Sequence, residues 1–226
     1  MNVIDNKNHT FVNPYSYSIL RKQRPGYLTK NCFQLHYDGI ALVCLSNALG
    51  LPSKRSSFDD TSLAPTVFSE CQRHQLSVGL VGSAPGIAEE ASQLLQQRYP
   101  SLIVQLVSDG FLSGQTEVDV KEKALECDVI VCSMGTPRQE DFLYELRLQN
   151  WEGTGFTCGG FLDQLVSAGG KDYYPTWVDR YNLRWLYRIA KEPRRLLFRY
   201  AVDYPVGMTL FIFDFFFTRE RKHTDA

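Results

Sequence analysis

The sequence predicts an α/β fold: a Rossmann-like, mostly parallel sheet with helices on both faces, followed by a helical C-terminal appendage. Short apolar runs alternate with segments whose apolar residues recur at helical spacing, which is typical of a parallel sheet. The C-terminal part of the chain differs from the rest in charge. Residues 180–226 are basic, with ten Lys or Arg against five Asp or Glu, whereas residues 1–179 are acidic, with 14 against 20. We therefore expect an α/β domain over residues 1–175 and an appendage over residues 176–226.

The size and composition fit one substantial core. The chain has 226 residues and 44% hydrophobic content, so it is neither fibrous nor disordered. Its N-terminus, "MNVIDNKNHT", has no apolar core and no basic leader, so we expect no signal peptide and a cytoplasmic location. The six cysteines form no C-x-x-C pair, and we expect reduced core residues rather than disulfides or metal ligands. They are Cys32, Cys44, Cys71, Cys127, Cys132 and Cys158.

Four predicted strands, each followed by a helix, make up the middle of the chain. The first strand is the apolar run at residues 76–82, and the others span residues 101–107, 128–134 and 153–160, the last of which enters its helix through glycines. The helices follow at residues 85–100, 117–127, 138–150 and after residue 160. Upstream, Asn13 and Pro14 follow two apolar residues, which indicates a strand that turns into a helix. A further apolar helix pattern begins at Ile40.

Polar loops follow the predicted strands: "GSAPG", "SDGF", "GTPRQE" and "CGGFLD". The carboxyl ends of parallel strands meet at one edge of a sheet, so we expect the ligand there. Glycines let the backbone approach a ligand, and helix N-termini suit phosphate. The candidates in these loops are Gly82, Gly159, Gly160 and Asp163. Neither G-x-G-x-x-G nor a P-loop motif occurs, so no classical dinucleotide or P-loop site is predicted.

Two polar positions allow an ordinary structural interpretation beside a functional one. In "GTPRQE", Thr136 as N-cap and Pro137 as the first helical residue would make a normal helix start. That interpretation does not explain why Arg138 and Gln139 stand together at the end of a strand. Asp38 likewise is either the N-cap of the helix that begins near Ile40 or a site residue.

Six segments resemble, in this order, the successive blocks of the WecG/TagA/CpsF family of bacterial glycosyltransferases. They are "NPYSYSIL", "YDGIALV", "VGLVGSAPGIAEEASQLLQQRYPSL", "MGTPRQEDFL", "CGGFLD" and "PTWVDRYNLRWLYRIAKEPRRLLFRY". The similarity covers residues 10–202, and its last two blocks are long enough to be specific.

The resemblance implies an enzyme that moves a sugar from a UDP-sugar to a polyprenyl-diphosphate-linked saccharide, with inversion and with no required metal or cofactor. Members of the family add N-acetylmannosamine, its uronic acid or hexoses such as glucose during assembly of surface polysaccharides. The implied partners are the donor, the lipid-linked acceptor and the inner membrane surface, with no nucleic acid. The implied location is the cytoplasmic face of that membrane.

Family residues fall on particular positions of this chain. The aspartate proposed as general base falls on Asp38, and inversion needs such a carboxylate to take the proton of the acceptor hydroxyl. Residues that resemble the family's sugar-site positions are Thr10, Asn13, Arg55 and Gln139. Residues similar to the basic positions thought to grip the diphosphate are Arg188, Arg195 and Arg199.

The chain departs from the family pattern in several places. Few residues precede the "NP" block, so the usual first strand and helix are largely missing and we expect a different sheet edge. Phe58 stands where a glycine is usual, "DYYPTW" lacks the usual basic and small residues, and Arg184 replaces a typical glutamate. These changes indicate either a different donor or acceptor sugar, or lost activity. No D-x-D motif occurs in a loop, and Asp59 and Asp60 are a lesser candidate for a metal, so we expect a metal-free site.

The apolar segment "VGMTLFIFDFFF" at residues 206–217 is too short to cross a bilayer, which takes about twenty residues. Basic residues flank it, at Arg194, Arg195, Arg199, Arg219, Arg221 and Lys222. This pattern favours a segment that lies in the interface of an anionic membrane. The alternative is a helix buried against the domain or against a second subunit, so a homo-oligomer is also an expectation.

Three functions follow from these observations. The first is the UDP-sugar-dependent transferase. The second keeps the fold but not the chemistry, as a UDP-sugar-binding or complex-forming protein whose altered loops have lost turnover. The third sets the resemblance aside and is a generic Rossmann-like oxidoreductase or methyltransferase, against which the missing glycine motif counts.

Overall fold

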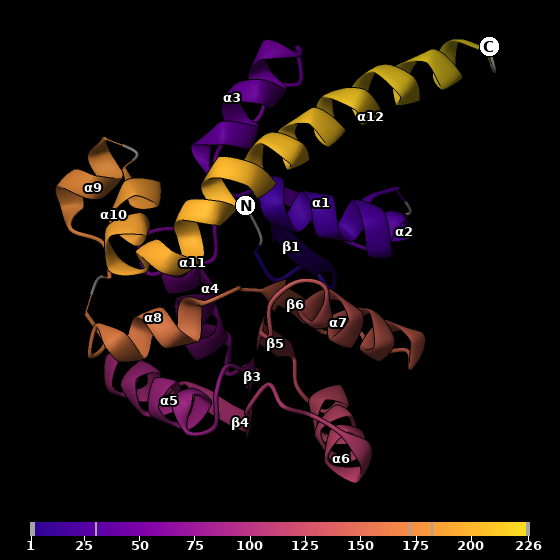
Figure 1. The fold of residues 1–226 in the computed structure, drawn as a ribbon. Helices are drawn as coiled ribbons and strands as arrows, with labels where there is room; N and C mark the ends of the chain where they lie inside the picture. The colour runs from indigo at the N-terminus through magenta and orange to yellow at the C-terminus, as the bar shows by residue number, and fades with distance from the viewer. Residues whose placement is uncertain (1–2, 30, 172, 182, 225–226) are drawn as a thin grey trace.

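One parallel sheet organises the computed structural model, which describes residues 3–29, 31–171, 173–181 and 183–224. Within these residues the strand order is β2-β1-β6-β5-β3-β4, and every neighbouring pair is parallel (Figure 1). The strands are β1 (Asn8–Val12), β2 (Gln34–Tyr37), β3 (Ser77–Gly82), β4 (Ile103–Ser108), β5 (Val129–Ser133) and β6 (Thr154–Thr157).

Helices connect these strands and form the C-terminal part of the chain. The first eight are α1 (Pro14–Gln23), α2 (Pro25–Thr29), α3 (Ile40–Ala48), α4 (Ala64–His74), α5 (Ile87–Arg98), α6 (Gly114–Leu125), α7 (Arg138–Leu148) and α8 (Phe161–Ser167). The remainder are α9 (Thr176–Arg180), α10 (Arg184–Lys191), α11 (Pro193–Phe198), the π-helix η1 (Arg199–Asp203) and α12 (Tyr204–Thr224).

Both faces of the sheet are covered by helices, as predicted. On one face Phe68 of α4, Leu95 of α5 and Leu162 of α8 pack with the buried side chains of β3, β5 and β6. On the other face Ala124 of α6 and Leu143 of α7 pack with the alternate residues of β3 and β5 and with Leu106 of β4. Successive strand residues point to opposite faces, so strands buried on both sides read as the continuous apolar runs seen in the sequence.

Two strands from opposite ends of the α/β part of the chain, β1 and β6, lie side by side inside the sheet. β1 pairs with β6, with Asn8 opposite Gly155 and His9 opposite Phe156. The chain starts at β1, places β2 on one side of it, and places β3, β4, β5 and β6 on the other side. The strand order therefore changes direction between β1 and β6. Ligands of open parallel sheets bind at the carboxyl ends of strands beside such a reversal.

The strand predictions for the middle of the chain are confirmed, with boundaries that differ by a few residues. The strand expected before Asn13 is β1, so a strand does precede the "NP" block. Asn13 caps α1, because its Oδ1 accepts from Ser16 N at 3.1 Å while Ser16 Oγ accepts from Asn13 N at 2.9 Å. β2 was not predicted: it has four residues and leaves Leu35 37% exposed, so it carries no apolar pattern.

All six cysteines are free, as expected, but not all of them are core residues. Cys71, Cys127, Cys132 and Cys158 are buried. The prediction is wrong for Cys44, which is exposed on α3, and Cys32 is only half-buried. Apolar neighbours in sequence do not identify which side of a helix faces the core.

The C-terminal helices leave the sheet: in Figure 1 α9, α10 and α11 lie at the left, and α12 runs from there to the upper right. α12 packs along α1 and α3, and Phe211 is buried with Tyr17 and Leu42. The helical run Leu196–Phe217 has 22 residues and is long and apolar enough, by length and composition, to cross a membrane. The twelve-residue segment predicted from the sequence was therefore too short, because α11 and η1 continue into α12 without a break.

Candidate active site

A cavity of about 1250 Å³ lies where β1, β5 and β6 end. The strand ends and their loops supply its polar floor, including Asn13, Asp38, Ser133, Gln139, Thr157 and Asp163. The chain after residue 170 supplies the opposite wall, including Tyr174, Arg184, Tyr187, Arg188, Arg199 and Tyr204. The sheet and the C-terminal helices thus build one site together.

Asp38 faces this cavity and does not cap a helix. Its backbone N donates to Val12 O at 2.8 Å, which continues the pairing of β2 with β1. α3 begins at Ile40, and the cap position belongs to Gly39, whose φ of +92° suits glycine. No side-chain hydrogen bond caps α3. The N-cap interpretation of Asp38 is therefore wrong, and its carboxylate lines the cavity.

Charges around Asp38 oppose one another. Burial and the neighbouring carboxylate of Asp59 raise the pKa of Asp38, while Arg188, Arg55 and Arg184 lower it. The net result is a pKa above the usual value. A carboxylate with a raised pKa is a better match for taking a proton from a hydroxyl near neutral pH.

Gln139 lies at the floor of the cavity and is held by its neighbours. Its Oε1 accepts from Gly159 N at 3.2 Å, and its Nε2 donates to Glu140 Oε1 at 3.1 Å. Glu140 Oε1 also accepts from Thr10 Oγ1 at 2.8 Å. Thr10 itself is fully buried beneath the cavity and does not line it. The structure therefore brings Gln139 to the cavity and leaves Thr10 to support it from below.

Glu140 is a buried carboxyl group with an incomplete hydrogen-bond shell. It is 1% exposed, and its Oε2 has no hydrogen-bond partner among the described residues. Burial raises the pKa of Glu140, although its hydrogen bonds from Gln139 and Thr10 oppose the shift. Gln139 was predicted from the sequence but Glu140 was not, because it resembles an ordinary acidic residue of a first helical turn.

The loop "GTPRQE" is not the helix start that the pattern suggested. Pro137 occupies the N-cap position of α7, and Thr136 Oγ1 donates to Glu140 Oε1 at 3.2 Å instead of capping the backbone. Arg138 turns away to Gly110, whose carbonyl oxygen accepts from Arg138 Nη2 at 2.6 Å. Arg138 and Gln139 are therefore not presented together to a ligand. The buried Glu140 competes for the Thr136 hydroxyl, and a sequence pattern does not show that competition.

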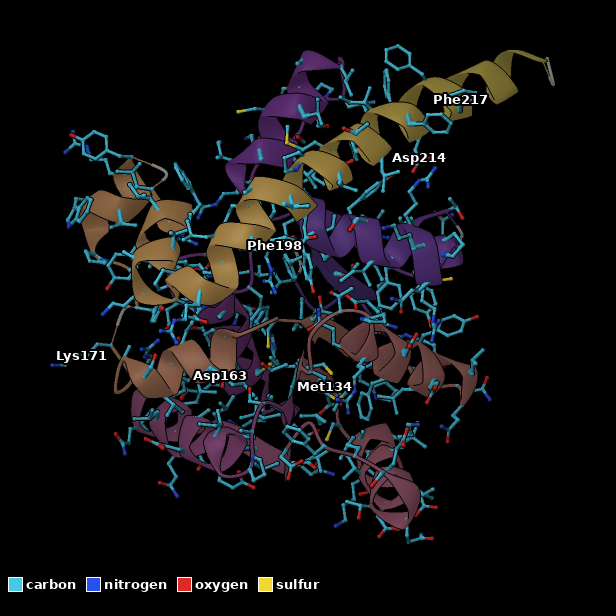
Figure 2. All side chains as sticks on the ribbon, viewed as in Figure 1. Met134, Asp163, Lys171, Phe198, Asp214 and Phe217 are labelled. Atoms are coloured by element: carbon cyan, nitrogen blue, oxygen red, sulfur yellow. The ribbon has the colours of Figure 1, made fainter. Side chains whose placement is uncertain are left out.

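Three of the four predicted loop residues line the cavity. Gly159, with φ of +58°, and Gly160 lead into α8, where Asp163 occupies the first turn. Asp163 Oδ2 accepts from Ser83 Oγ at 2.8 Å, and Figure 2 labels Asp163 on α8. Gly82 does not line the cavity. Its φ is +140° and a Cβ there would lie 2.4 Å from the carbonyl carbon of Ser133, so it serves strand packing.

Positive side chains from two parts of the chain line the cavity. Arg55, Arg188 and Arg199 line the cavity, and the guanidinium carbon of Arg199 lies 4.0 Å from the ring centre of Tyr15. Arg195 is on α11, but its side chain is outside the part of the chain that the structure describes. Arginine is well suited to a diphosphate because its planar donors match phosphate oxygens in pairs.

The tyrosines of the cavity wall were not predicted as site residues. Tyr173, Tyr174, Tyr187, Tyr200 and Tyr204 all line the cavity. The density of tyrosines after residue 170 is the sequence signal for them, but the basic and Phe-rich composition of the segment predicts only contact with a membrane or a diphosphate. Tyrosines of this kind offer ring faces to a sugar and hydroxyls to polar groups.

The adjacent carboxylates Asp59 and Asp60 are each held by an arginine. Arg184 pairs with Asp59, and Arg98 Nη1 donates to Asp60 Oδ1 at 2.6 Å. Within the described ranges, no group of three or more His, Cys, Asp or Glu side chains is arranged to hold a metal ion. These two aspartates therefore act as ion-pair partners in this structure.

Comparison with known proteins identifies the family. The family model of the glycosyl transferase WecG/TagA/CpsF family matches residues 3–221. The chain is 34% identical over 208 residues to a "UDP-Gal:alpha-D-GlcNAc-diphosphoundecaprenol beta-1,4-galactosyltransferase" of Shigella boydii, over 90% of this chain and 84% of that one. It is 27% identical over 160 residues to an "N-acetylglucosaminyldiphosphoundecaprenol N-acetyl-beta-D-mannosaminyltransferase" of Bacillus spizizenii, over 70% of this chain and 60% of that one. A protein with the same description from Staphylococcus aureus is 32% identical over 124 residues, which are 54% of this chain and 47% of that one. The chain belongs to the WecG/TagA/CpsF family of glycosyl transferases.

Proposed function

We propose that this protein is an inverting glycosyltransferase that moves a sugar from a UDP-sugar to a polyprenyl-diphosphate-linked saccharide. The observation that carries the proposal is Asp38, a carboxylate with a raised pKa that lines the cavity within the electrostatic reach of three arginines. Family membership supports the same reaction class. It also argues against a generic oxidoreductase or methyltransferase.

The proposed chemistry assigns one task to each side of the cavity. Asp38 takes the proton of the acceptor hydroxyl as that oxygen forms its bond to the anomeric carbon. The bond from that carbon to UDP breaks at the same time, and UDP leaves with the electron pair. Arg188, Arg55 and Arg199 then stabilise the negative charge on the diphosphates of donor and acceptor. Gln139 is proposed to orient a sugar hydroxyl.

We propose a UDP-hexose as donor, with UDP-galactose as the first candidate. The Shigella boydii relative, aligned over 90% of this chain, is described as using UDP-Gal and forming a β linkage. UDP-galactose has an α linkage, so a β product requires inversion. The Bacillus and Staphylococcus relatives are described as N-acetylmannosaminyltransferases, so UDP-N-acetylmannosamine is the second donor to test. The family resemblance adds the uronic acid of N-acetylmannosamine and glucose as further donors. The acceptor proposed from all three relatives is an undecaprenyl-diphosphate-linked N-acetylglucosamine.

The division of the chain is part of the proposal. Residues 1–175 are proposed to bind the nucleotide sugar, and residues 176–226 to hold the lipid-linked diphosphate and contact the membrane. The two parts meet at the cavity, because Arg188 and Asp38 both line it. A soluble donor and a lipid-linked acceptor meet at the cytoplasmic face of the inner membrane, which is the proposed location.

We propose that α12 lies in the membrane interface and does not cross the bilayer. Asp214 lies within its apolar run, and Asp214 Oδ2 accepts from Tyr17 Oη at 2.8 Å and Arg21 Nε at 2.7 Å. Both partners belong to α1, so one side of α12 is held against the folded body and away from lipid. The exposed large side chains available to the membrane are Phe198, Val202, Val206, Phe213, Phe216 and Phe217 (Figure 2 labels Phe198 and Phe217).

The test is a transfer assay with purified protein and a synthetic lipid-diphosphate-linked N-acetylglucosamine. UDP-galactose, UDP-glucose, UDP-N-acetylmannosamine and its uronic acid are offered one at a time. We expect transfer from one of them, and a loss of about 10²- to 10⁴-fold in kcat in Asp38→Asn with UDP binding retained. UDP binding without transfer from any donor would favour the alternative, a UDP-sugar-binding or complex-forming protein without turnover. Equal transfer by the wild type and Asp38→Asn would contradict the role of Asp38.

A further inference from the structure

The ion pair between Asp59 and Arg184 joins two distant parts of the chain. Asp59 precedes α4 and is 8% exposed, and Arg184 is the first residue of α10. Arg184 Nη1 donates to Asp59 Oδ2, and Arg184 Nη2 donates to Thr61 Oγ1. Ser57 Oγ donates to the same Asp59 oxygen at 2.5 Å, and Thr61 N donates to Asp59 Oδ1 at 3.0 Å. Both carboxylate oxygens are satisfied, which gives the pair a defined geometry.

The guanidinium of Arg184 is also held on its face. Its central carbon lies 4.7 Å from the ring centre of Tyr174, and Tyr174 is 6% exposed. An arginine bonded at its edge and covered by an aromatic ring has little freedom to change position. The start of α10 is therefore attached at one point to the loop before α4.

One helical turn after Arg184, α10 carries Arg188. Residues four apart on a helix lie on the same face, and both arginines line the cavity. Both positive charges act on Asp38. Burial opposes the charge of Arg188, but Asp38 and the surrounding tyrosine hydroxyls raise its pKa above the usual value. The position of Arg188 beside Asp38 thus depends on where α10 is attached.

We propose that the Asp59–Arg184 pair is a positioning device that holds α10 against the strand ends and keeps Arg188 beside Asp38. This inference rests on the proposed function, because the consequence of the attachment is measured on sugar transfer. Asp59 and Arg184 act through Arg188, and Nη1 and Nη2 of Arg184 donate to Asp59 and Thr61. In this role neither residue is a catalytic residue.

The first test compares Arg184→Met with Arg180→Met in the full chain. Arg180 is an exposed arginine at the end of α9 and is the matched control. In Arg184→Met we expect faster amide hydrogen exchange in α10 with unchanged exchange in β3 and β5, and a loss of about 10²-fold in kcat/KM. Arg180→Met should change neither. Unchanged exchange in α10 of Arg184→Met would overturn the proposal.

A pH profile separates positioning from loss of folded protein. Asp38 is active as a carboxylate, so activity rises as pH rises through its pKa. Removal of Arg184, and displacement of Arg188 with it, takes away attractions that lower this pKa. Asp59, Arg55 and the hydroxyls of Tyr174 and Tyr204 remain as its charged and titratable neighbours. The acid limb of kcat/KM should therefore move to higher pH in Arg184→Met, whereas partial unfolding would lower the whole profile without moving the limb.

A double-mutant cycle with Asp59→Asn and Arg184→Met tests whether the two residues act as one unit. If they do, the double variant loses no more activity than the worse single variant. Losses that multiply would overturn the proposal. The double variant also carries no unpaired buried charge, so it replaces Arg184→Met in the exchange measurement if that variant does not fold. A wild-type protein without transfer contradicts the proposed function, and hydrogen exchange in α10 then still decides the attachment.

Discussion

Thr10 and Glu140 are joined by a hydrogen bond of 2.8 Å from Thr10 Oγ1 to Glu140 Oε1, although 130 residues separate them in the chain. Thr10 Oγ1 in turn accepts from Thr157 Oγ1 at 3.1 Å. β1, β6 and α7 are thus linked beneath the cavity through side chains. Because Glu140 Oε1 also accepts from Gln139, the position of Gln139 at the cavity floor depends on this buried network.

Thr10→Val should lower the free energy of unfolding by about 1–3 kcal/mol, because it keeps the shape of the side chain but removes the donor to Glu140 and the acceptor of Thr157. Urea unfolding measures the change. Thr10→Ser keeps the hydroxyl and is the control, with a smaller loss. Equal stability of Thr10→Val and wild type would show that the network adds nothing to the fold.

Glu140→Gln should change how stability depends on pH. Burial raises the folded-state pKa of Glu140 above its value of 4.5 in the unfolded chain, so the folded protein binds the proton more tightly. This group therefore contributes most at low pH, and stability falls as pH rises from 4.5 through the raised pKa. The variant removes this fall and should be more stable than wild type at neutral pH, by about 1.4 kcal/mol for each tenfold difference in proton affinity between the folded and unfolded chain. Unfolding curves from pH 4 to 8 test this, and parallel curves for both proteins would refute it.

Asp38 should set the acid limb of the pH profile of sugar transfer. Burial and Asp59 raise its pKa above the usual 3.8, so kcat/KM should fall tenfold per pH unit below an apparent pKa higher than that. The measurement is initial rates at low substrate concentration across pH 4 to 9. A limb at or below 3.8 would mean that the surrounding arginines outweigh the burial of Asp38.

Asp214→Ala should loosen α12 from α1, because Tyr17 and Arg21 both lose their acceptor. Burial and the hydrogen bond to Asp214 raise the pKa of Tyr17, which shows how closely the two groups interact. We expect the free energy of opening α12 to fall by about 1–3 kcal/mol. Amide hydrogen exchange should therefore be faster across residues 204–217, and exchange in the sheet should not change. Asp203→Ala on η1 is the control. The same exchange rates in both variants would argue against this attachment.

Liposome binding should depend on the exposed phenylalanines of α12. Replacing Phe213, Phe216 and Phe217 with serine removes apolar side chains worth about 1.5–3 kcal/mol each when fully buried, so binding to anionic vesicles should fall at least tenfold. Removal of residues 205–226 should release the protein as well. Phe111→Ser, a 68% exposed residue far from α12 in sequence, is the control. Undiminished binding of the triple variant would leave α12 without a role at the membrane.

Much of the fold was readable from the sequence, and less of the site. β3 and β5 are apolar runs, and runs of this kind appear in the sequence because both faces of these strands are covered. β2 was missed because a short edge strand with exposed side chains has no such signature. Asp38, Gln139 and Asp163 were predicted from the sequence and line the cavity, whereas Thr10 and Gly82 lie beneath or beside it.

The sequence by itself determined the alternation of strands and helices, the edge of the sheet where the site lies, and the family resemblance, since each of these depends on residues near one another in the chain. Only the tertiary structure decided that β1 pairs with β6, that Glu140 is buried against Thr10, and that Arg184 attaches α10 to Asp59. These contacts join residues more than a hundred positions apart. Such contacts are stabilised by burial and by opposite charges that meet only in the folded chain, and the local periodicity of the sequence does not encode which distant residues meet.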